Sequence, residues 1–171
     1  MKELNFQPVK SREDFRKNYE VHDMAEFHGK NLLLQWGIDF NDFGNDRRYE
    51  KVWEKGDDKP DIVGEYIGHR FLLDWKGKTK EAYWVNKRAI ESYINWSEKF
   101  NIPIIICFFL FDKNQQLTDR RFAVIKKHKF EIAGNKAWDK NDVVKFEIDL
   151  PVFTKKNLIH FLTQSTNNNN Q

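Results

Sequence analysis

Length, composition and charge already narrow what this chain can be. Its 171 residues, 40% of them hydrophobic, are enough for one domain with a buried core. With 32% charged residues and a mean hydropathy of -0.78, the chain contains no apolar run of the roughly 18 residues that a membrane helix needs. The single cysteine, Cys107, excludes a disulfide framework and a zinc site built from cysteines. A net charge of +3 and a pI near 8.8 permit a nucleic-acid partner without requiring one.

The chain ends and the lone cysteine set expectations about location. The first residues, Met1 to Asn5, lack the apolar stretch of a signal peptide, so we expect an intracellular, reducing location in the cytoplasm. Cys107 lies inside the apolar run from Ile102 to Phe111 and is interpreted as a small core residue. We expect one domain over residues 1–162 and a disordered, Asn-rich tail over 163–171. No membrane contact is expected, and a homodimer is compatible with the sequence.

The N-terminal third predicts two helices, a loop and a strand. Ser11 can cap a short polar helix that runs toward Glu20. Asp23 can cap a second helix over 23–36, and Gly37 can close it. Asn, Asp and Gly dominate residues 38–48, which predicts a loop; a strand is expected at 49–54 and a turn at 55–60.

A β-hairpin is predicted over residues 61–76. Two β-rich runs are separated by Gly68 and His69, which fits a type II′ turn with Gly at its first central position. In that register Asp61 faces Lys76 across the hairpin.

This hairpin brings two acids and a lysine together. Directly opposed residues share a face, and so do alternate residues of one strand, so Asp61, Asp74 and Lys76 converge. A one-residue slip would break the convergence, because it would send one strand's set to the other side. The opposite face is mostly apolar and suited to a core: Ile62, Gly64, Tyr66, Phe71, Leu73 and Trp75.

A helix and a buried strand follow the hairpin. The stripe of Ala89, Ile90 and Tyr93 predicts a helix from about Asn86 to Phe100 that packs against the core. Pro103 blocks further helix, and residues 104–111 form a continuous apolar run typical of a strand buried on both faces. Strand, helix and buried strand in this order suggest a right-handed parallel crossover.

The remaining chain predicts further strands and a short helix. Strands are expected over 122–130 and 143–150, on either side of a turn near Gly134. Thr154 can cap a final helix through Phe161. The predicted fold class is therefore α/β, with a mixed central sheet flanked by helices.

Two carboxylates on one face repel each other unless a cation lies between them. Hard oxygen ligands suit Mg²⁺ or Mn²⁺, and Mg²⁺ commonly takes only one or two protein carboxylates. Such an ion polarises a phosphate and lowers the pKa of bound water. Lys76 could orient the attacking water, offset charge on the phosphate or, if desolvated, act as a base. The structural alternative is an exposed cross-strand ion pair between Asp61 and Lys76, beside a surface acid at Asp74.

The motif and the order of elements together resemble a known family. Pro60-Asp61, then Asp74-Trp75-Lys76, in a predicted α-β-β-β-α-β order over 23–111, resemble the PD-(D/E)xK nucleases of restriction-endonuclease-like fold. The resemblance implies that Asp61 and Asp74 bind the metal with the backbone carbonyl of Trp75, and that Lys76 is the catalytic lysine.

The same resemblance suggests further residues. Many members carry an acid on the first helix, where Glu26 falls, although an ion pair with Lys30 is at least as good an interpretation. The segment from Tyr83 to Lys87 looks like that of archaeal Holliday-junction resolvases, and the helix lacks the Gln that helicase-associated exonucleases carry. Candidate DNA contacts are Lys78, Lys80 and Lys87.

The leading hypothesis is an Mg²⁺-dependent deoxyribonuclease, most simply an endonuclease, whose partner is DNA. One alternative is a nucleic-acid-binding module that keeps the fold without turnover. Another is a partner-binding structural domain whose interface uses Trp84, Trp96 and Trp138. The choice between duplex, branched and single-stranded substrates stays open at this point.

Overall fold

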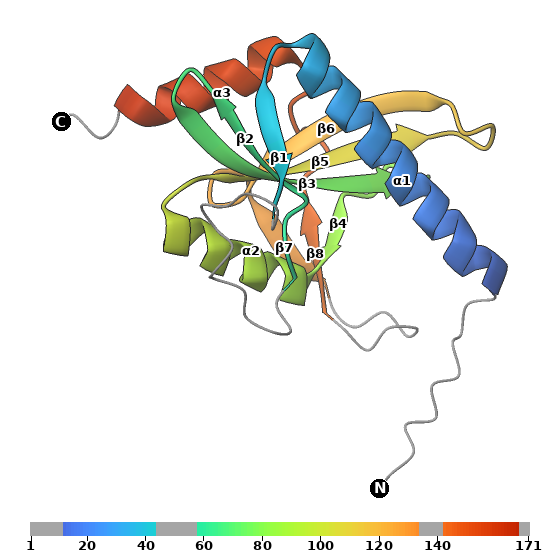
Figure 1. Ribbon diagram of the computed structural model, residues 1–171. Coiled ribbons are helices and arrows are strands. Elements are labelled where there is room, and N and C mark those ends of the chain that lie inside the picture. Colours follow the sequence, from blue (N-terminus) through green and yellow to red (C-terminus); the bar gives the residue numbers. More distant parts are fainter. Residues whose placement is uncertain (1–11, 44–57, 134–141, 168–171) are drawn as a thin grey trace, which may run out of the picture.

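The computed structural model describes residues 12–43, 58–133 and 142–167 (Figure 1). These residues form a mixed α/β structure. Its elements, in chain order, are α1 Arg12–Gln35, β1 Asp39–Asp42, β2 Ile62–Tyr66, β3 His69–Lys78, β4 Trp84–Asn86, α2 Lys87–Phe100, β5 Ile104–Phe111, β6 Leu117–Val124, β7 Phe130–Ala133, β8 Val143–Phe146 and α3 Lys155–Asn167.

The main sheet has five strands in the order β1-β2-β3-β5-β6. β3 and β5 run parallel, joined through α2, whereas the other neighbours are antiparallel. A smaller antiparallel sheet has the order β4-β8-β7. Apart from β4, which belongs to the smaller sheet, the order is α1-β1-β2-β3-α2-β5 around a mixed central sheet, as in a restriction-endonuclease-like core, so the predicted fold class is confirmed.

Both faces of the main sheet are covered, one by two helices and the other by a helix and the smaller sheet. Figure 1 shows α1 and α3 on one face, and α2 with β4, β7 and β8 on the other. Two apolar clusters fill the two interfaces. Phe153 is central to the cluster beneath α1 and α3. Its ring contacts those of Trp36, Trp75, Phe109 and Phe122 at centroid distances of 5.1 to 6.2 Å.

The N-terminal helix differs from the prediction of two helices. α1 runs unbroken from Arg12 to Gln35, so Asp23 is an interior residue and not a cap. Packing of α1 along β3 outweighs the weak preference of a single Asp for a helix start. The predicted end is confirmed, since Gly37 has a φ of +69° just past the last turn.

The position of the first strand also differs from the prediction. β1 lies at Asp39–Asp42, within the segment predicted as a loop. Its residues have low strand propensity, and pairing with β2 supplies the order that the sequence lacks locally. The strand predicted at 49–54 lies outside the described residues.

The central crossover follows the prediction closely. β5 spans Ile104–Phe111 with every residue buried, including Cys107. α2 spans Lys87–Phe100 and buries Ala89, Ile90 and Tyr93. The apolar stripe and the continuous apolar run were therefore correctly interpreted as core.

The C-terminal part contains shorter strands than predicted. The expected strand over 122–130 is divided by a turn, in which Lys126 has a φ of +80°, into the end of β6 and the start of β7. β8 ends at Phe146. Thr154 caps α3 as predicted, because its Oγ1 accepts a hydrogen bond from the Asn157 N–H (3.1 Å). The helix continues to Asn167, so residues 163–167, which were predicted to belong to a disordered tail, are helical. Among the described residues, none of the helices has the length and apolar character needed to span a bilayer.

Candidate metal-binding active site

The hairpin that carries the acids turns one position earlier than predicted. Tyr66 pairs with His69, so the two central turn residues are Ile67 and Gly68. Their φ angles are +46° and +76°, as a type I′ turn requires in place of the predicted type II′. Placing a β-branched residue at positive φ is unfavourable, and the extensive pairing of β3 with β2 and β5 offsets that cost.

The earlier turn shifts the register by two residues. Val63 faces Leu72 instead of Asp74, and continuing the same register places Asp61 opposite Asp74 instead of Lys76. Because side chains alternate with a period of two, a two-residue shift leaves every side chain on its predicted face. The structure therefore brings Asp61 and Asp74 closer together than the predicted register would.

Asp61 lies where the backbone ladder between β2 and β3 gives way to a side-chain contact. Its N–H donates to the Leu73 carbonyl (3.0 Å), and its Oδ2 accepts a hydrogen bond from the Trp75 N–H (2.7 Å). The Phe43 N–H donates to the Asp61 carbonyl (2.9 Å). Backbone contacts on both sides therefore fix the carboxyl group beside β3.

Asp74 and Lys76 form a contact ion pair inside the protein. Lys76 Nζ lies 2.6 Å from Asp74 Oδ2, and the two side chains are 27% and 3% exposed. Apart from this lysine, the buried Oδ2 has no hydrogen-bond donor among the described residues. The alternative of an exposed cross-strand pair is wrong on two counts, because the lysine pairs with Asp74 and the acid is buried.

Burial and a neighbouring acid keep a proton on Asp61. Burial and the negative charge of the Asp74 carboxylate raise the pKa of Asp61 to about 8. The Trp75 N–H and Lys76 oppose this rise without cancelling it. In the metal-free protein near pH 7, Asp61 is therefore mostly protonated.

Lys76 stays cationic in this environment. Burial alone would lower its pKa, but attraction to Asp74 and Asp61 outweighs burial and raises the pKa of Lys76 above its usual value. A cationic ammonium group favours charge stabilisation or water orientation over the role of a base. Tyr93 of α2 is buried near Asp74, so burial and the charge of that carboxylate raise the pKa of its hydroxyl.

The donor set fits a small divalent cation. The carboxylates of Asp61 and Asp74 act on each other electrostatically, and a cation bound between them would offset their mutual repulsion. No group of three or more His, Cys, Asp or Glu that could hold a metal is present in the described part of the chain. A pair of acids suits Mg²⁺, which keeps several waters. Asp61 and Asp74 are the residues that would hold it.

Glu26 does not join the two acids. It forms an i to i+4 ion pair with Lys30 (2.7 Å), and Lys30 also contacts Asp42 (2.9 Å). The helix that carries Glu26 covers the face of the main sheet that receives Trp75, whereas Asp74 faces α2. Of the two interpretations of Glu26, the structure shows the ion pair.

The three candidate DNA-contact lysines have different surroundings. Lys78 Nζ donates to the Trp84 carbonyl (2.7 Å), which ties the end of β3 to β4. Lys87 lies 3.6 Å from Glu91 on the first turn of α2. Lys80 is exposed. Their contacts with DNA stay a prediction.

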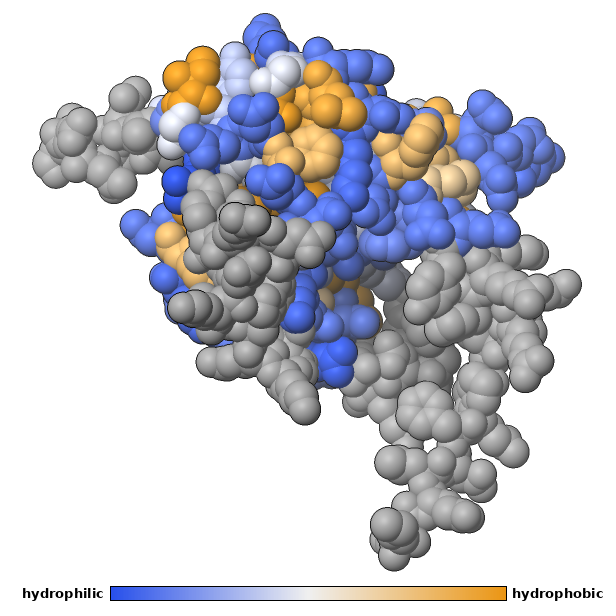
Figure 2. All heavy atoms as spheres, viewed as in Figure 1, coloured by the Kyte–Doolittle hydropathy of each residue, from blue (hydrophilic) through white to orange (hydrophobic). Residues whose placement is uncertain are grey.

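The aromatic interface expected by the partner-binding alternative is partly wrong. Trp96 is 3% exposed and stacks on Phe100 with centroids 5.6 Å apart. Trp84 is half-buried, and Trp138 lies outside the described residues. Figure 2 shows a mainly hydrophilic surface on one face of the molecule with separate apolar spots in its upper part.

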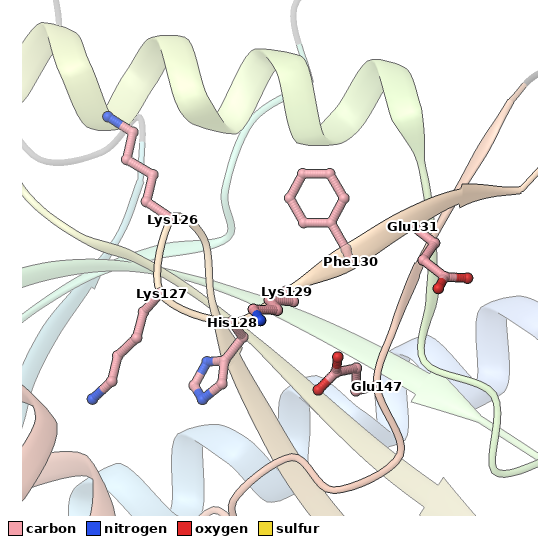
Figure 3. A pocket seen from close by; sticks show the side chains of 7 residues that line it. All are labelled: Lys126, Lys127, His128, Lys129, Phe130, Glu131 and Glu147. Carbon is pink, nitrogen blue, oxygen red and sulfur yellow. The ribbon is translucent and has the colours of Figure 1, made fainter.

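A hollow of about 420 Å³ lies at the turn between β6 and β7 (Figure 3), lined by residues 126–131 and Glu147. Three lysines and two glutamates balance much of each other's charge there. Lys126 is further paired with Glu98 of α2 (3.2 Å). Neither Asp61 nor Asp74 lines this hollow, so it is not part of the candidate metal site.

Sequence reasoning missed two residues near the acids. Tyr93 appeared only as part of an apolar stripe, and Asp58 only as part of a turn. Asp58 binds Arg88, 30 residues away, and its charge acts on Lys76. No local pattern could join residues at that separation.

Comparison with known proteins adds a likeness of fold. No family model matches the chain, and no curated protein matches its sequence. Among solved structures, the chain is similar to Archaeoglobus fulgidus Hjc, a Holliday junction resolvase, at 10% identity and a TM-score of 0.47. The match covers 72% of this chain and 87% of that one. At this level of similarity the likeness carries no information about the reaction.

Proposed function

We propose that this protein is a metal-dependent deoxyribonuclease that hydrolyses DNA phosphodiester bonds as an endonuclease. The observation that carries the proposal is the set of buried Asp74 with half-buried Asp61 and Lys76, in which Asp61 holds a proton up to a pH of about 8. A structural ion pair needs one acid and one base, whereas this set contains an extra acid at an energetic cost.

Each residue has a distinct task in this proposal. Asp61 and Asp74 would hold Mg²⁺, which Mn²⁺ would replace, and the carbonyl of Trp75 is the predicted third ligand. When bound, the ion would polarise the scissile phosphate and lower the pKa of a bound water. Lys76, already cationic, stabilises the charge that develops on the phosphate. Lys78, Lys80 and Lys87 are proposed to contact the DNA backbone.

The nature of the substrate follows from the family that the motif resembles, whose members cut DNA. The purified protein should be incubated with linear, nicked, branched and single-stranded DNA in Mg²⁺ or Mn²⁺. Cleavage should require the metal, stop in EDTA and disappear in Asp74→Ala.

The same experiment separates the alternatives. Full cleavage by Asp74→Ala would exclude the proposed site. DNA binding that persists in EDTA, without cleavage of any substrate in metal, would favour the non-catalytic binding module. Asp119→Asn is a suitable control, because it removes an acid that pairs with Arg121 on β6 and not with the site.

A further inference from the structure

Asp58, three residues before Asp61, is held at each of its polar groups by α2. Its carboxylate accepts two hydrogen bonds from Arg88, from Nε and from Nη2, each at 3.3 Å. Its N–H donates to Ser92 Oγ (3.3 Å), and its carbonyl accepts from Trp96 Nε1 (3.0 Å).

The three partners form one stripe on the helix. Arg88, Ser92 and Trp96 are spaced four residues apart, so their side chains lie above one another on the same face of α2. Trp96 is buried, which shields its bond to Asp58 from water. Two hydrogen bonds to backbone groups and a bidentate carboxylate contact fix both the place and the direction of the chain at Asp58.

Only Lys59 and Pro60 separate this contact from the acid. Pro60 is buried, its φ is fixed by its ring, and it restricts Lys59 to an extended conformation. On the other side, Asp61 is bonded to β3 through Leu73 and Trp75. Asp61 is therefore held on both sides, by the short segment that leads to Asp58 and α2 and by its hydrogen bonds to β3.

The same helix faces the second acid. Tyr93, buried on α2 between Ser92 and Trp96, lies close enough to Asp74 that burial and that carboxylate both raise the pKa of its hydroxyl. One helix is thus packed beside both carboxylates, and it is bonded to the chain that leads into Asp61 through Asp58.

We propose that Arg88 is a positioning residue which, through Asp58, fixes Asp61 beside Asp74. Arg88 touches neither metal nor substrate in this role. The relevance to catalysis rests on the proposed nuclease function, whereas the positioning of Asp61 can be measured without metal or DNA. The Trp75 amide, whose partner is Asp61 Oδ2, reports that position directly.

The test is amide hydrogen exchange by NMR on the metal-free protein. In Arg88→Ala the Trp75 amide should exchange about twofold to fivefold faster than in wild type, because Asp61 samples displaced positions; the effect is modest since the Arg88 side chain is 73% exposed. Arg88→Lys should recover part of the protection. The Cys107 amide in the centre of β5 should be unchanged, which distinguishes local release from global loss of stability.

A double-mutant cycle shows whether Arg88 acts through Asp58. Asp58→Ala keeps the backbone bonds to Ser92 and Trp96 but removes the carboxylate, so combining it with Arg88→Ala should add no further exchange. Glu98→Gln is the matched control, since it removes a different α2 ion pair, with Lys126, and should leave the Trp75 amide protected.

Calorimetric titration with Mn²⁺ alone connects positioning to the site. Arg88→Ala should weaken Mn²⁺ binding about twofold to fivefold and lower kcat by a similar factor with little change in KM. Wild-type exchange at Trp75 in a folded Arg88→Ala variant would overturn the proposal. If wild type neither binds Mn²⁺ nor cuts DNA, the nuclease function fails, while the exchange data still decide the positioning.

Discussion

The two faces of β3 differ in what their alternate residues do. Phe71, Leu73 and Trp75 face α1 and α3 in an apolar interface, each fully buried. On the other face, Leu72 packs in the core, but Asp74 and Lys76 place buried charge beside α2. One strand therefore contributes both a supporting interface and a reactive set. The first face can be disturbed mainly through packing, the second mainly through charge.

After the complete loss of cleavage expected for Asp74→Ala, the next largest effect is expected from the lysine on the charged face. Lys76→Ala should lower kcat for DNA cleavage about 10²-fold, because it removes the cation beside the reacting phosphate. Lys76→Arg should lose less, since it keeps the charge. Lys156→Ala, which removes an exposed lysine on α3, serves as the control. Equal activity of Lys76→Ala and wild type would show that the charged face has no part in cleavage.

On the apolar face, a single methyl group should matter. A Cβ added at Gly29 of α1 would lie 2.4 Å from the buried Trp75 ring, which has little room to move. Gly29→Ala should therefore lower the free energy of unfolding by about 1–3 kcal/mol, although Ala favours helix by about 1 kcal/mol elsewhere. Chemical denaturation measures this change. Gln35→Ala, at the exposed end of the same helix, should be close to neutral, and a stabilised Gly29→Ala would contradict the close packing.

The proton on Asp61 predicts how stability varies with pH. Its pKa, about 8 in the folded protein, exceeds the ordinary value near 3.8, so the folded state binds the extra proton between those values. Metal-free protein should therefore lose stability as pH rises from about 4 to 8, by at most about 1.4 kcal/mol per unit.

Asp61→Asn isolates that contribution. Its stability in EDTA should be flatter over the same pH range, as measured by thermal unfolding at a series of pH values. Adding Mg²⁺ should stabilise wild type most at pH 8 and above, where Asp61 loses its proton. Parallel curves for the two proteins would mean that Asp61 titrates normally.

The smallest effect is expected at Glu26, on the helix that covers the apolar face. Glu26→Gln removes an ion pair with Lys30 whose side chains are 35% and 27% exposed, so cleavage should stay within about twofold of wild type. Metal titration of the cleavage rate measures any contribution. A large loss that excess Mg²⁺ restores would place Glu26 in the metal site after all.

Much of the site was predictable because its key property is parity. The alternation of β3 places Asp74 and Lys76 on the face opposite Trp75 whatever the register, and Asp61 of the other strand shares their face in any register that differs from the predicted one by an even number of residues. The turn was predicted at Gly68-His69 and lies at Ile67-Gly68, but this shifts the register by two residues and leaves each side chain on its predicted face. Which residue faces Asp61 was not predictable, because pairing with β5 and core packing outweigh the local turn preference.

The sequence alone determined the features that depend on local periodicity: the buried strand β5, the amphipathic helix α2, and the shared face of Asp61, Asp74 and Lys76. Tertiary structure decided the unbroken α1, the polar strand β1 and the burial of Asp74. It also decided the contact of Asp58 with Arg88. Each of these depends on contacts between distant parts of the chain, whose free energy outweighs local preferences and leaves no pattern within a short window of sequence.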